Sequence, residues 1–297
     1  MPVFKAPSGT ICFDQRGSRA STPILLIHGL GCQLIHWPDS FLDGFVEAGY
    51  RPVVFDNRDT GLSFENESEP PTIPELLQAL DDPNSINPSY TLADMAADSI
   101  ALLNHIGQSG AHIVGVSMGG MIAQYMAINH PERVFSLTLL MSSTGSLETP
   151  KPGPEVIGAL ATSIVSPTRE ENIEATRNSD RLFGGPHYDS CEVGIGRFVE
   201  QAYDRSHRPN GVLRQLAAIV SDGDRRESLK QVETPSLALH GDADPLVDQF
   251  GSKDLAATMP NCRLRIIEKL GHDLPEPLIP VMLEEILDHI GSVEAAR

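Results

Sequence analysis

The residue with the most distinctive chemical surroundings in this chain is Ser117, in the segment Gly115-Val116-Ser117-Met118-Gly119. An apolar pair, Ile113-Val114, precedes this segment, and a helical pattern follows it. A strand, Gly-x-Ser-x-Gly and a helix together make a sharp turn that exposes the serine hydroxyl at the carboxyl end of the strand. Glycine is needed there because side chains would collide with the neighbouring strand and helix. The pattern predicts that Ser117 is a nucleophile.

A nucleophilic serine needs a histidine as base and a carboxylate that orients the histidine. In folds with this turn the partners follow in the order serine, acid, histidine, each in a loop after a later strand. Asp244 and His272 each follow an apolar run of strand length, so we expect Asp244 to be the acid and His272 the base. Asp242 is the rival acid, although a turn-stabilising role suits it better. Asp273, next to the base, is expected to be solvated.

An acyl-transfer site also needs two backbone N–H groups that bind the oxyanion. One is expected from Met118, whose amide opens a helix and gains from the helix dipole. The other is expected from Leu30, within His28-Gly29-Leu30-Gly31. This loop is not a dinucleotide-binding fingerprint, because Leu34 stands where the third glycine belongs. His28 is expected to brace the loop, since no second histidine or cysteine has the spacing of a metal site.

The elements that must position these residues follow from alternating strand and helix patterns. Such alternation is typical of an α/β fold with a mainly parallel sheet and helices on both faces. Helices are predicted at residues 92–103, at 118–130 and from about 275 onward. Besides the run before Ser117, the apolar runs predict strands at residues 10–13, 23–28, 51–56, 134–141, 235–240 and 263–267.

Two segments interrupt the alternation. Residues 65–89 are rich in proline and acidic residues and predict a long loop with a short helix near 74–80. Residues 145–228 carry helical patterns and no convincing strand, and active sites open where parallel strands end. We therefore expect residues 145–228 to form a helical cap on an α/β core of residues 1–144 and 229–297, rather than a decoration. The apolar faces of 195–199 and 213–220 are expected to line or cover the pocket, one of them also packing on the core.

Composition excludes several classes of function. The net charge of −18 argues against nucleic acid and anionic membrane surfaces as partners. The four cysteines lie far apart, no apolar run reaches membrane-spanning length and the amino terminus lacks a signal pattern, so a cytoplasmic protein is expected. The excess of acidic residues is explained by the solubility that they give the protein or, as a second interpretation, by adaptation to a salty environment. The sequence does not predict an oligomeric state.

Taken together, these motifs resemble the α/β-hydrolase superfamily, over the chain from about Ile24 to the final helix. The turn at residues 56–63 is similar to that of capped serine esterases of the aclacinomycin methylesterase group, although the chain departs from that group at His28. Ser117 speaks against epoxide hydrolases and dehalogenases, which use an aspartate nucleophile. Within the turn, Arg58 and Asp59 are expected to stabilise it rather than to contact substrate.

The resemblance implies an enzyme that cleaves carboxylic esters of small to medium size through an acyl-enzyme, with no cofactor or metal. Carbon–carbon bond hydrolysis, enol-lactone opening and cofactor-free perhydrolysis use the same constellation and remain open. A second class also remains open, namely a ligand receptor that uses this fold with little turnover.

Overall fold

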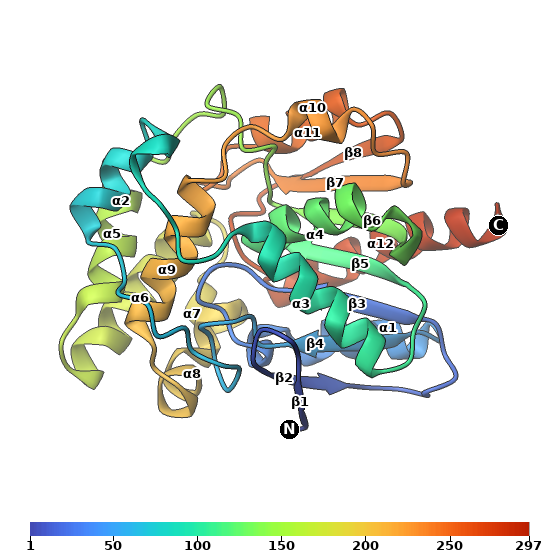
Figure 1. Ribbon diagram of the computed structural model, residues 1–297, viewed down its shortest axis with the longest axis horizontal. Helices are drawn as coiled ribbons and strands as arrows, with labels where there is room; N and C mark the ends of the chain where they lie inside the picture. Colours follow the sequence, from blue (N-terminus) through green and yellow to red (C-terminus); the bar gives the residue numbers. More distant parts are fainter. Residues whose placement is uncertain (297) are drawn as a thin grey trace.

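The computed structural model describes residues 1–296, which fold around one eight-stranded sheet (Figure 1). The strand order is β1-β2-β4-β3-β5-β6-β7-β8. The pairs from β4 to β8 are parallel, whereas β2 runs antiparallel to β1 and β4. The strands are β1 Val3–Lys5, β2 Thr10–Gln15, β3 Pro23–Ile27, β4 Arg51–Phe55, β5 Ala111–Val116, β6 Val134–Leu140, β7 Ser236–Gly241 and β8 Cys262–Ile267.

The central strands β3, β4 and β5 are buried along their whole length. Helices cover both of their faces, and this is why they read as continuous apolar runs rather than alternating ones. The α/β fold class and the mainly parallel sheet are therefore confirmed. The sequence did not predict β1, because a three-residue edge strand is too short to show an alternation.

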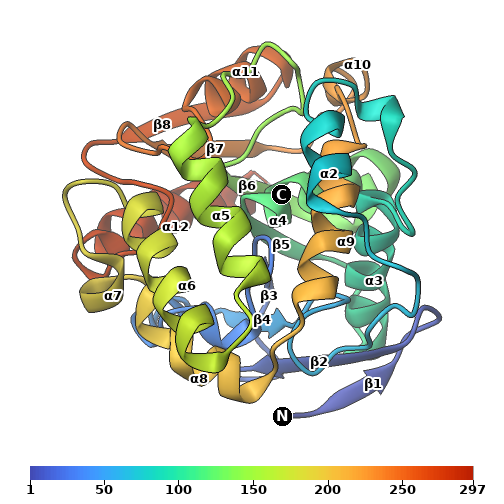
Figure 2. The ribbon, with the colours of Figure 1, turned by 90° about the vertical axis from the view of Figure 1, so that its left-hand side faces the viewer.

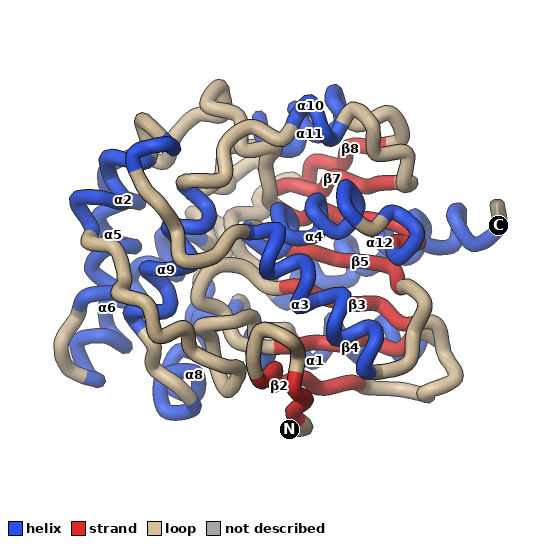
Figure 3. The backbone as a smooth tube through the Cα atoms, viewed as in Figure 1, coloured by secondary structure: helices blue, strands red, loops and turns tan. Residues whose placement is uncertain are grey.

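Two layers of helices enclose the sheet (Figure 3). On one face α3 and α4 pack over a core that includes Leu102, Ile122 and Leu139, and on the other α1 and α12 pack over Phe41, Leu239 and Ile286. No helix among residues 1–296 is long and apolar enough to cross a membrane. The core helices are α1 Asp39–Glu47, α3 Leu92–His105, α4 Met118–Asn129, α10 Arg226–Leu229, α11 Phe250–Thr258 and α12 Ile279–Ala295.

A separate group of helices lies beyond the carboxyl ends of the strands (Figures 1 and 2). All but one of them come from the chain between β6 and β7, and α2 from residues 65–89 packs beside α9. The expected short helix near 74–80 is thus α2. The group consists of α2 Ile73–Ala79, α5 Pro154–Val165, α6 Arg169–Phe183, α7 Ser190–Val193, α8 Val199–Arg205 and α9 Pro209–Val220, with the short 3₁₀ turn η4 Ile195–Phe198.

Local sequence signals start these helices. Thr72 caps α2 with Glu75 in a reciprocal capping box, and the hydroxyl of Thr168 accepts a hydrogen bond from the amide of Glu171 at the start of α6. Pro154 and Pro209 occupy the first position of α5 and α9, where a missing N–H costs nothing. The beginnings of these four helices are therefore defined by local residues and do not depend on how the helices pack together.

Candidate active site

Ser117 occupies the turn between β5 and α4 in a conformation that side chains rarely adopt. Its φ is +56° and its ψ is −119°. A side chain in place of Gly115 would collide with the backbone of Gly119, and one in place of Gly119 would collide with the carbonyl of Ile27. The glycines therefore let strand and helix meet closely enough to hold the serine in its strained conformation.

The loops after β7 and β8 bring an acid and a base together. The Nδ1 atom of His272 lies 2.7 Å from Oδ2 of Asp244, and the Asp244 side chain is fully buried. The amides of Leu246 and Val247 each donate a hydrogen bond of 2.9 Å to the other oxygen of Asp244. The rival Asp242 lies elsewhere, since its carboxylate accepts a hydrogen bond from the amide of Lys269. With Nδ1 held by a carboxylate, Nε2 of His272 remains for proton transfer.

A second histidine, His240, contacts the same carboxylate. Its Nε2 lies 3.2 Å from Oδ2 of Asp244 and 2.8 Å from the carbonyl of Val247, and its Nδ1 pairs with the hydroxyl of Ser252. Burial alone would raise the pKa of Asp244, but the charges and hydrogen bonds of His272 and His240 outweigh it and hold that pKa far below its usual range. Asp244 is therefore present as a carboxylate that can accept a hydrogen bond from Nδ1 of His272.

Two backbone amides beside Ser117 have no acceptor within residues 1–296. They belong to Leu30, in the loop after β3, and to Met118, in the first turn of α4. The loop approaches the serine closely, because a Cβ on Gly29 would lie 3.2 Å from Cβ of Ser117. The Leu30 and Met118 amides expected from the sequence thus flank the same serine, where an oxyanion would form.

The loop after β3 is held from both sides. The amide of Gly29 donates to Nδ1 of His28, and the amide of Gly31 donates to Oε1 of Gln215 on α9. Burial lowers the pKa of His28 well below its usual value, so the ring is neutral and Nε2 carries its proton. The sequence offered no signal for Gln215, because its partners are distant in the chain.

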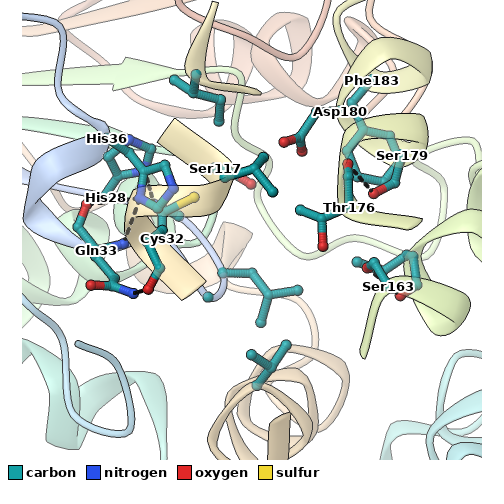
Figure 4. Close-up of a pocket in the computed structure, with 18 of the residues that line it drawn as sticks. His28, Cys32, Gln33, His36, Ser117, Ser163, Thr176, Ser179, Asp180 and Phe183 are labelled. Atoms are coloured by element: carbon teal, nitrogen blue, oxygen red, sulfur yellow. Dashed lines mark hydrogen bonds between the residues drawn. The ribbon is translucent and has the colours of Figure 1, made fainter. Parts of the chain in front are cut away.

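Ser117 and His272 open into one cavity of about 230 Å³ between the strand ends and the helices beyond them (Figure 4). Ile195 and Val199 line it, as the sequence predicts, but no residue of 213–220 does, and the lining residues of α9 are Pro209 and Val212. Residues 213–220 face other partners, with Ala218 packed into the core under α3 and α4. The sequence also missed α6, whose lining residues are Asn172, Thr176, Ser179, Asp180 and Phe183.

The expectation that Asp273 is solvated is wrong. Its side chain is buried, with the residue 3% exposed, and its Oδ1 accepts hydrogen bonds from the amides of Ile195 and Leu274. The carbonyl of Phe183, at the end of α6, also accepts a hydrogen bond of 2.7 Å from the amide of His272. The helices α6 and α7 and the turn η4 cover this loop, and a sequence pattern does not reveal which loop a distant helix will cover.

The turn at residues 56–63 binds the helices beyond the strands through buried ion pairs. Arg214 on α9 makes a two-pronged contact with Asp59, 2.9 Å at each oxygen, and Arg205 on α8 pairs with Asp56 at 2.7 Å. Arg58 pairs with Asp98 on α3 instead of with its neighbour. Neither Arg58 nor Asp59 lines the cavity, so both have the structural role expected of them.

Histidine, cysteine, aspartate and glutamate side chains do not gather into a group that could hold a metal ion anywhere in residues 1–296. Geometry and electrostatics instead define a serine, a histidine held by a carboxylate, and two free amides at one cavity.

Comparison with known proteins places this site in a family. Residues 22–276 match the model of the family described as the alpha/beta hydrolase fold, which is most of the chain. The chain therefore belongs to the α/β-hydrolase family and is an enzyme of that class, as the motifs predicted.

Particular relatives share most of their length with this chain. It is 28% identical to the rhodomycin D methylesterase of Streptomyces peucetius, over 91% of this chain and 92% of that one. It is also 28% identical to a 2-hydroxy-6-oxononadienedioate hydrolase of Burkholderia vietnamiensis, over 84% and 80% of the two chains. Among solved structures, a meta-cleavage product hydrolase of Pseudomonas fluorescens has a TM-score of 0.76 at 19% identity, over 98% of each chain. The resemblance to the methylesterase group is confirmed.

Proposed function

We propose that this protein is a serine hydrolase of small to medium carboxylic esters. Ser117 is the nucleophile, His272 the base, Asp244 the acid that orients it, and the amides of Leu30 and Met118 bind the oxyanion. Residues 145–228 serve as a helical cap over the α/β core of residues 1–144 and 229–297. The curated relatives support this proposal, since a methylesterase cleaves a carboxylic ester.

The mechanism has two steps that share one base. His272 takes the proton of Ser117 as the serine oxygen attacks the ester carbonyl, and the two amides stabilise the resulting oxyanion. His272 then gives the proton to the departing alcohol, which leaves an acyl group on Ser117. Water attacks this acyl-enzyme with help from the same histidine and releases the acid. The proposed reaction uses no cofactor or metal, and the proposed partner is a small molecule.

One observation carries the proposal: the strained Ser117 lines the same cavity as His272, whose ring Asp244 holds from behind, and two amides without acceptors lie beside the serine. Glycine would adopt the backbone conformation of Ser117 without strain, so the serine side chain does not stabilise the fold at this position. Strained residues of this kind cluster at active sites, where the fold holds a reactive group in place.

The test is covalent labelling together with turnover. A fluorophosphonate probe should label the wild type, and Ser117→Ala should abolish the labelling while the far-ultraviolet circular dichroism spectrum stays unchanged. An activated nitrophenyl ester should give a burst of nitrophenol near one equivalent of enzyme before linear turnover. Asp244→Asn should fold and lose about 10⁴-fold in kcat, because the imidazole loses its orientation and its charge partner.

Two results would refute parts of this assignment. Undiminished labelling of Ser117→Ala would remove Ser117 as the nucleophile, and full activity in Asp244→Asn would remove Asp244 as the acid. Stoichiometric release of nitrophenol without later turnover, across a panel of esters of graded chain length, would favour the ligand receptor instead.

Hydrolysis of a carbon–carbon bond is the second candidate. The 2-hydroxy-6-oxononadienedioate hydrolase from Burkholderia vietnamiensis is similar to this chain over most of both proteins, and its name gives an unsaturated keto diacid as its substrate. A spectrophotometric assay with such a dienoate, run beside the ester panel, separates the two activities. If kcat/KM for the dienoate is far above that for every ester, the dienoate rather than an ester is the substrate.

A further inference from the structure

The cavity contains a carboxyl group that the proposed ester chemistry does not use. Asp180 lies near the end of α6 and lines the cavity, and its carboxyl group extends toward the side on which Ser117 lies (Figure 4). Within residues 1–296 no group donates a hydrogen bond to this carboxyl, whereas the backbone carbonyl of Asp180 accepts one from the amide of Gly184 at the end of α6. A polar group that faces a cavity without a partner is available to a ligand.

A second carboxyl oxygen without a partner lies at the same wall. Asp273 lines the cavity and is 97% buried, since the residue is only 3% exposed. Both backbone donors reach its Oδ1, and Oδ2 has no hydrogen-bond partner. Gly194 packs directly against Oδ2, where any side chain would collide with it. The hydroxyl of Ser190 and the charge of His272 also favour the ionised form of this carboxyl, although burial outweighs them and raises its pKa.

The one charge that shifts the pKa of Asp180 is that of Asp273, which raises it, whereas His272 lowers the pKa of Asp273. Asp180 in turn raises the pKa of Cys32 and of Cys191 on α7. The three arginines on α6 pair with other acidic residues at the surface, namely Arg169 with Asp204, Arg177 with Glu200 and Arg181 with Asp189. Arg208 is the one arginine or lysine among the described lining residues, and its guanidinium is bound to the carbonyl of Ser63 and to Glu65.

We propose that Asp180 and Asp273 form a subsite for a positively charged nitrogen of the substrate, so that the enzyme prefers cationic esters over neutral ones of the same shape. This inference rests on the proposed ester hydrolysis at Ser117. A cationic nitrogen would supply the charge that the protein withholds from Asp180, and an interface of complementary charge selects its ligand against neutral competitors. No lining residue but these two offers such a charge on the α6 side of the cavity.

The subsite has a characteristic pH dependence. Burial, and then the charge of Asp273, raise the pKa of Asp180 to about 8 in the unliganded protein. Burial also raises the pKa of Asp273. A cation binds the ionised form of Asp180, so each bound cation releases one proton while Asp180 is otherwise protonated. Preference for a cation should therefore rise about tenfold per pH unit up to about pH 8 and then level off.

A matched pair of substrates tests this. One is the nitrophenyl ester of trimethylammoniohexanoate, whose charge does not titrate, and the other is its neutral isostere with a tert-butyl group in place of the trimethylammonium group. The ratio of the two kcat/KM values removes the shared contribution of His272. Wild type should favour the cationic ester at least tenfold at pH 8, and Asp180→Asn should reduce the ratio at least tenfold. Glu174→Gln, which removes a carboxylate from the exposed side of α6, should keep the wild-type ratio.

A binding measurement separates this inference from the proposed function. Titration of wild type with hexyltrimethylammonium, by calorimetry at pH 7 in buffers of different ionisation heat, should show release of nearly one proton per cation, and Asp180→Asn should show none. Equal hydrolysis of both esters at every pH, or equal ratios in wild type and Asp180→Asn, would overturn the subsite and leave the esterase intact. If the cation binds with release of a proton but no ester is turned over, the proposed subsite stands and the proposed ester hydrolysis is wrong.

Discussion

At the scale of single residues, the conformation of Ser117 allows a prediction about stability that does not involve catalysis. A side chain at φ +56° and ψ −119° is strained by about 1–3 kcal/mol, and glycine is not. Ser117→Gly should therefore be more stable than Ser117→Ala by about 1 kcal/mol in the free energy of unfolding, although glycine loses more backbone entropy than alanine.

Urea denaturation of the two variants measures this difference. The same pair at Ser142, a buried residue with ordinary backbone angles, is the control, because alanine should be the more stable there. If alanine is also the more stable at position 117, the turn relaxes in solution and the strain argument is wrong.

Asp180 gives the second prediction at this scale, a stability that depends on pH. The folded chain keeps a proton on Asp180 up to about pH 8, whereas an unfolded aspartate releases it near pH 4. The folded state therefore binds more protons in this window, and the free energy of unfolding falls as pH rises through it. Asp180→Asn removes this pH-dependent loss of stability. The free energy of unfolding of the variant minus that of wild type should therefore increase from about pH 4 to about pH 8 and stay constant above pH 8.

Thermal unfolding of wild type and Asp180→Asn, at intervals of one pH unit, measures this difference. The other titrating groups are the same in both proteins, so their contributions cancel when the two are compared at the same pH. A constant difference between the two melting temperatures would mean that Asp180 titrates normally.

At the scale of elements, the ion pair between Arg214 and Asp59 holds α9 against the turn at residues 56–63. Both side chains are nearly inaccessible, with 4% and 0% exposed, so removing one partner leaves a buried charge unpaired. Arg214→Met should therefore cost about 3–5 kcal/mol of stability, and the double variant with Asp59→Asn should cost less than the two single changes together.

A double-mutant cycle by urea denaturation measures that coupling. The surface pair of Arg169 and Asp204 serves as the comparison, since its side chains are 38% and 57% exposed. Breaking it should cost at most about 1 kcal/mol. Additive losses for Arg214 and Asp59 would show that α9 is held by packing alone.

The helices beyond the strand ends also allow a prediction about specificity. Val212 of α9 lines the cavity and packs against Gly31 in the loop after β3, and Ile195 lines it from η4. Val212→Phe and Ile195→Phe should shift the preference across an ester panel toward shorter chains, because each fills part of a cavity of about 230 Å³. Val220→Phe, on the same helix but outside the cavity, is the control. Unchanged chain-length profiles in both lining variants would make residues 145–228 a decoration.

At the scale of the whole molecule, the net charge of −18 predicts a response to salt. Acidic self-repulsion destabilises the folded state, and molar sodium chloride shortens the screening length to about 3 Å. Salt also screens the surface ion pairs, but exposed pairs contribute little each. The melting temperature should therefore rise with sodium chloride, as expected of a salt-adapted surface. A flat or falling curve would leave solubility as the explanation of the acidic excess.

Much of this molecule could be predicted from its sequence because the relevant signals are local. The turn around Ser117 follows from a few neighbouring residues, and the strands follow from apolar runs that the structure reproduces to within a few positions. The order of serine, acid and histidine along the chain was enough to nominate Asp244 and His272, because parallel strands bring their carboxyl ends to one edge of the sheet. The family match confirmed the class that these local patterns indicated.

Only the tertiary structure decided how distant segments meet. It brought Asp244 rather than Asp242 to His272, buried Asp273 under η4 and placed Asp180 of α6 at the same cavity. None of these contacts has a sequence pattern, because a polar residue looks the same in a helix whether it faces water or a cavity. Burial and pKa depend on which elements pack over a residue, and that packing is a property of the folded chain as a whole.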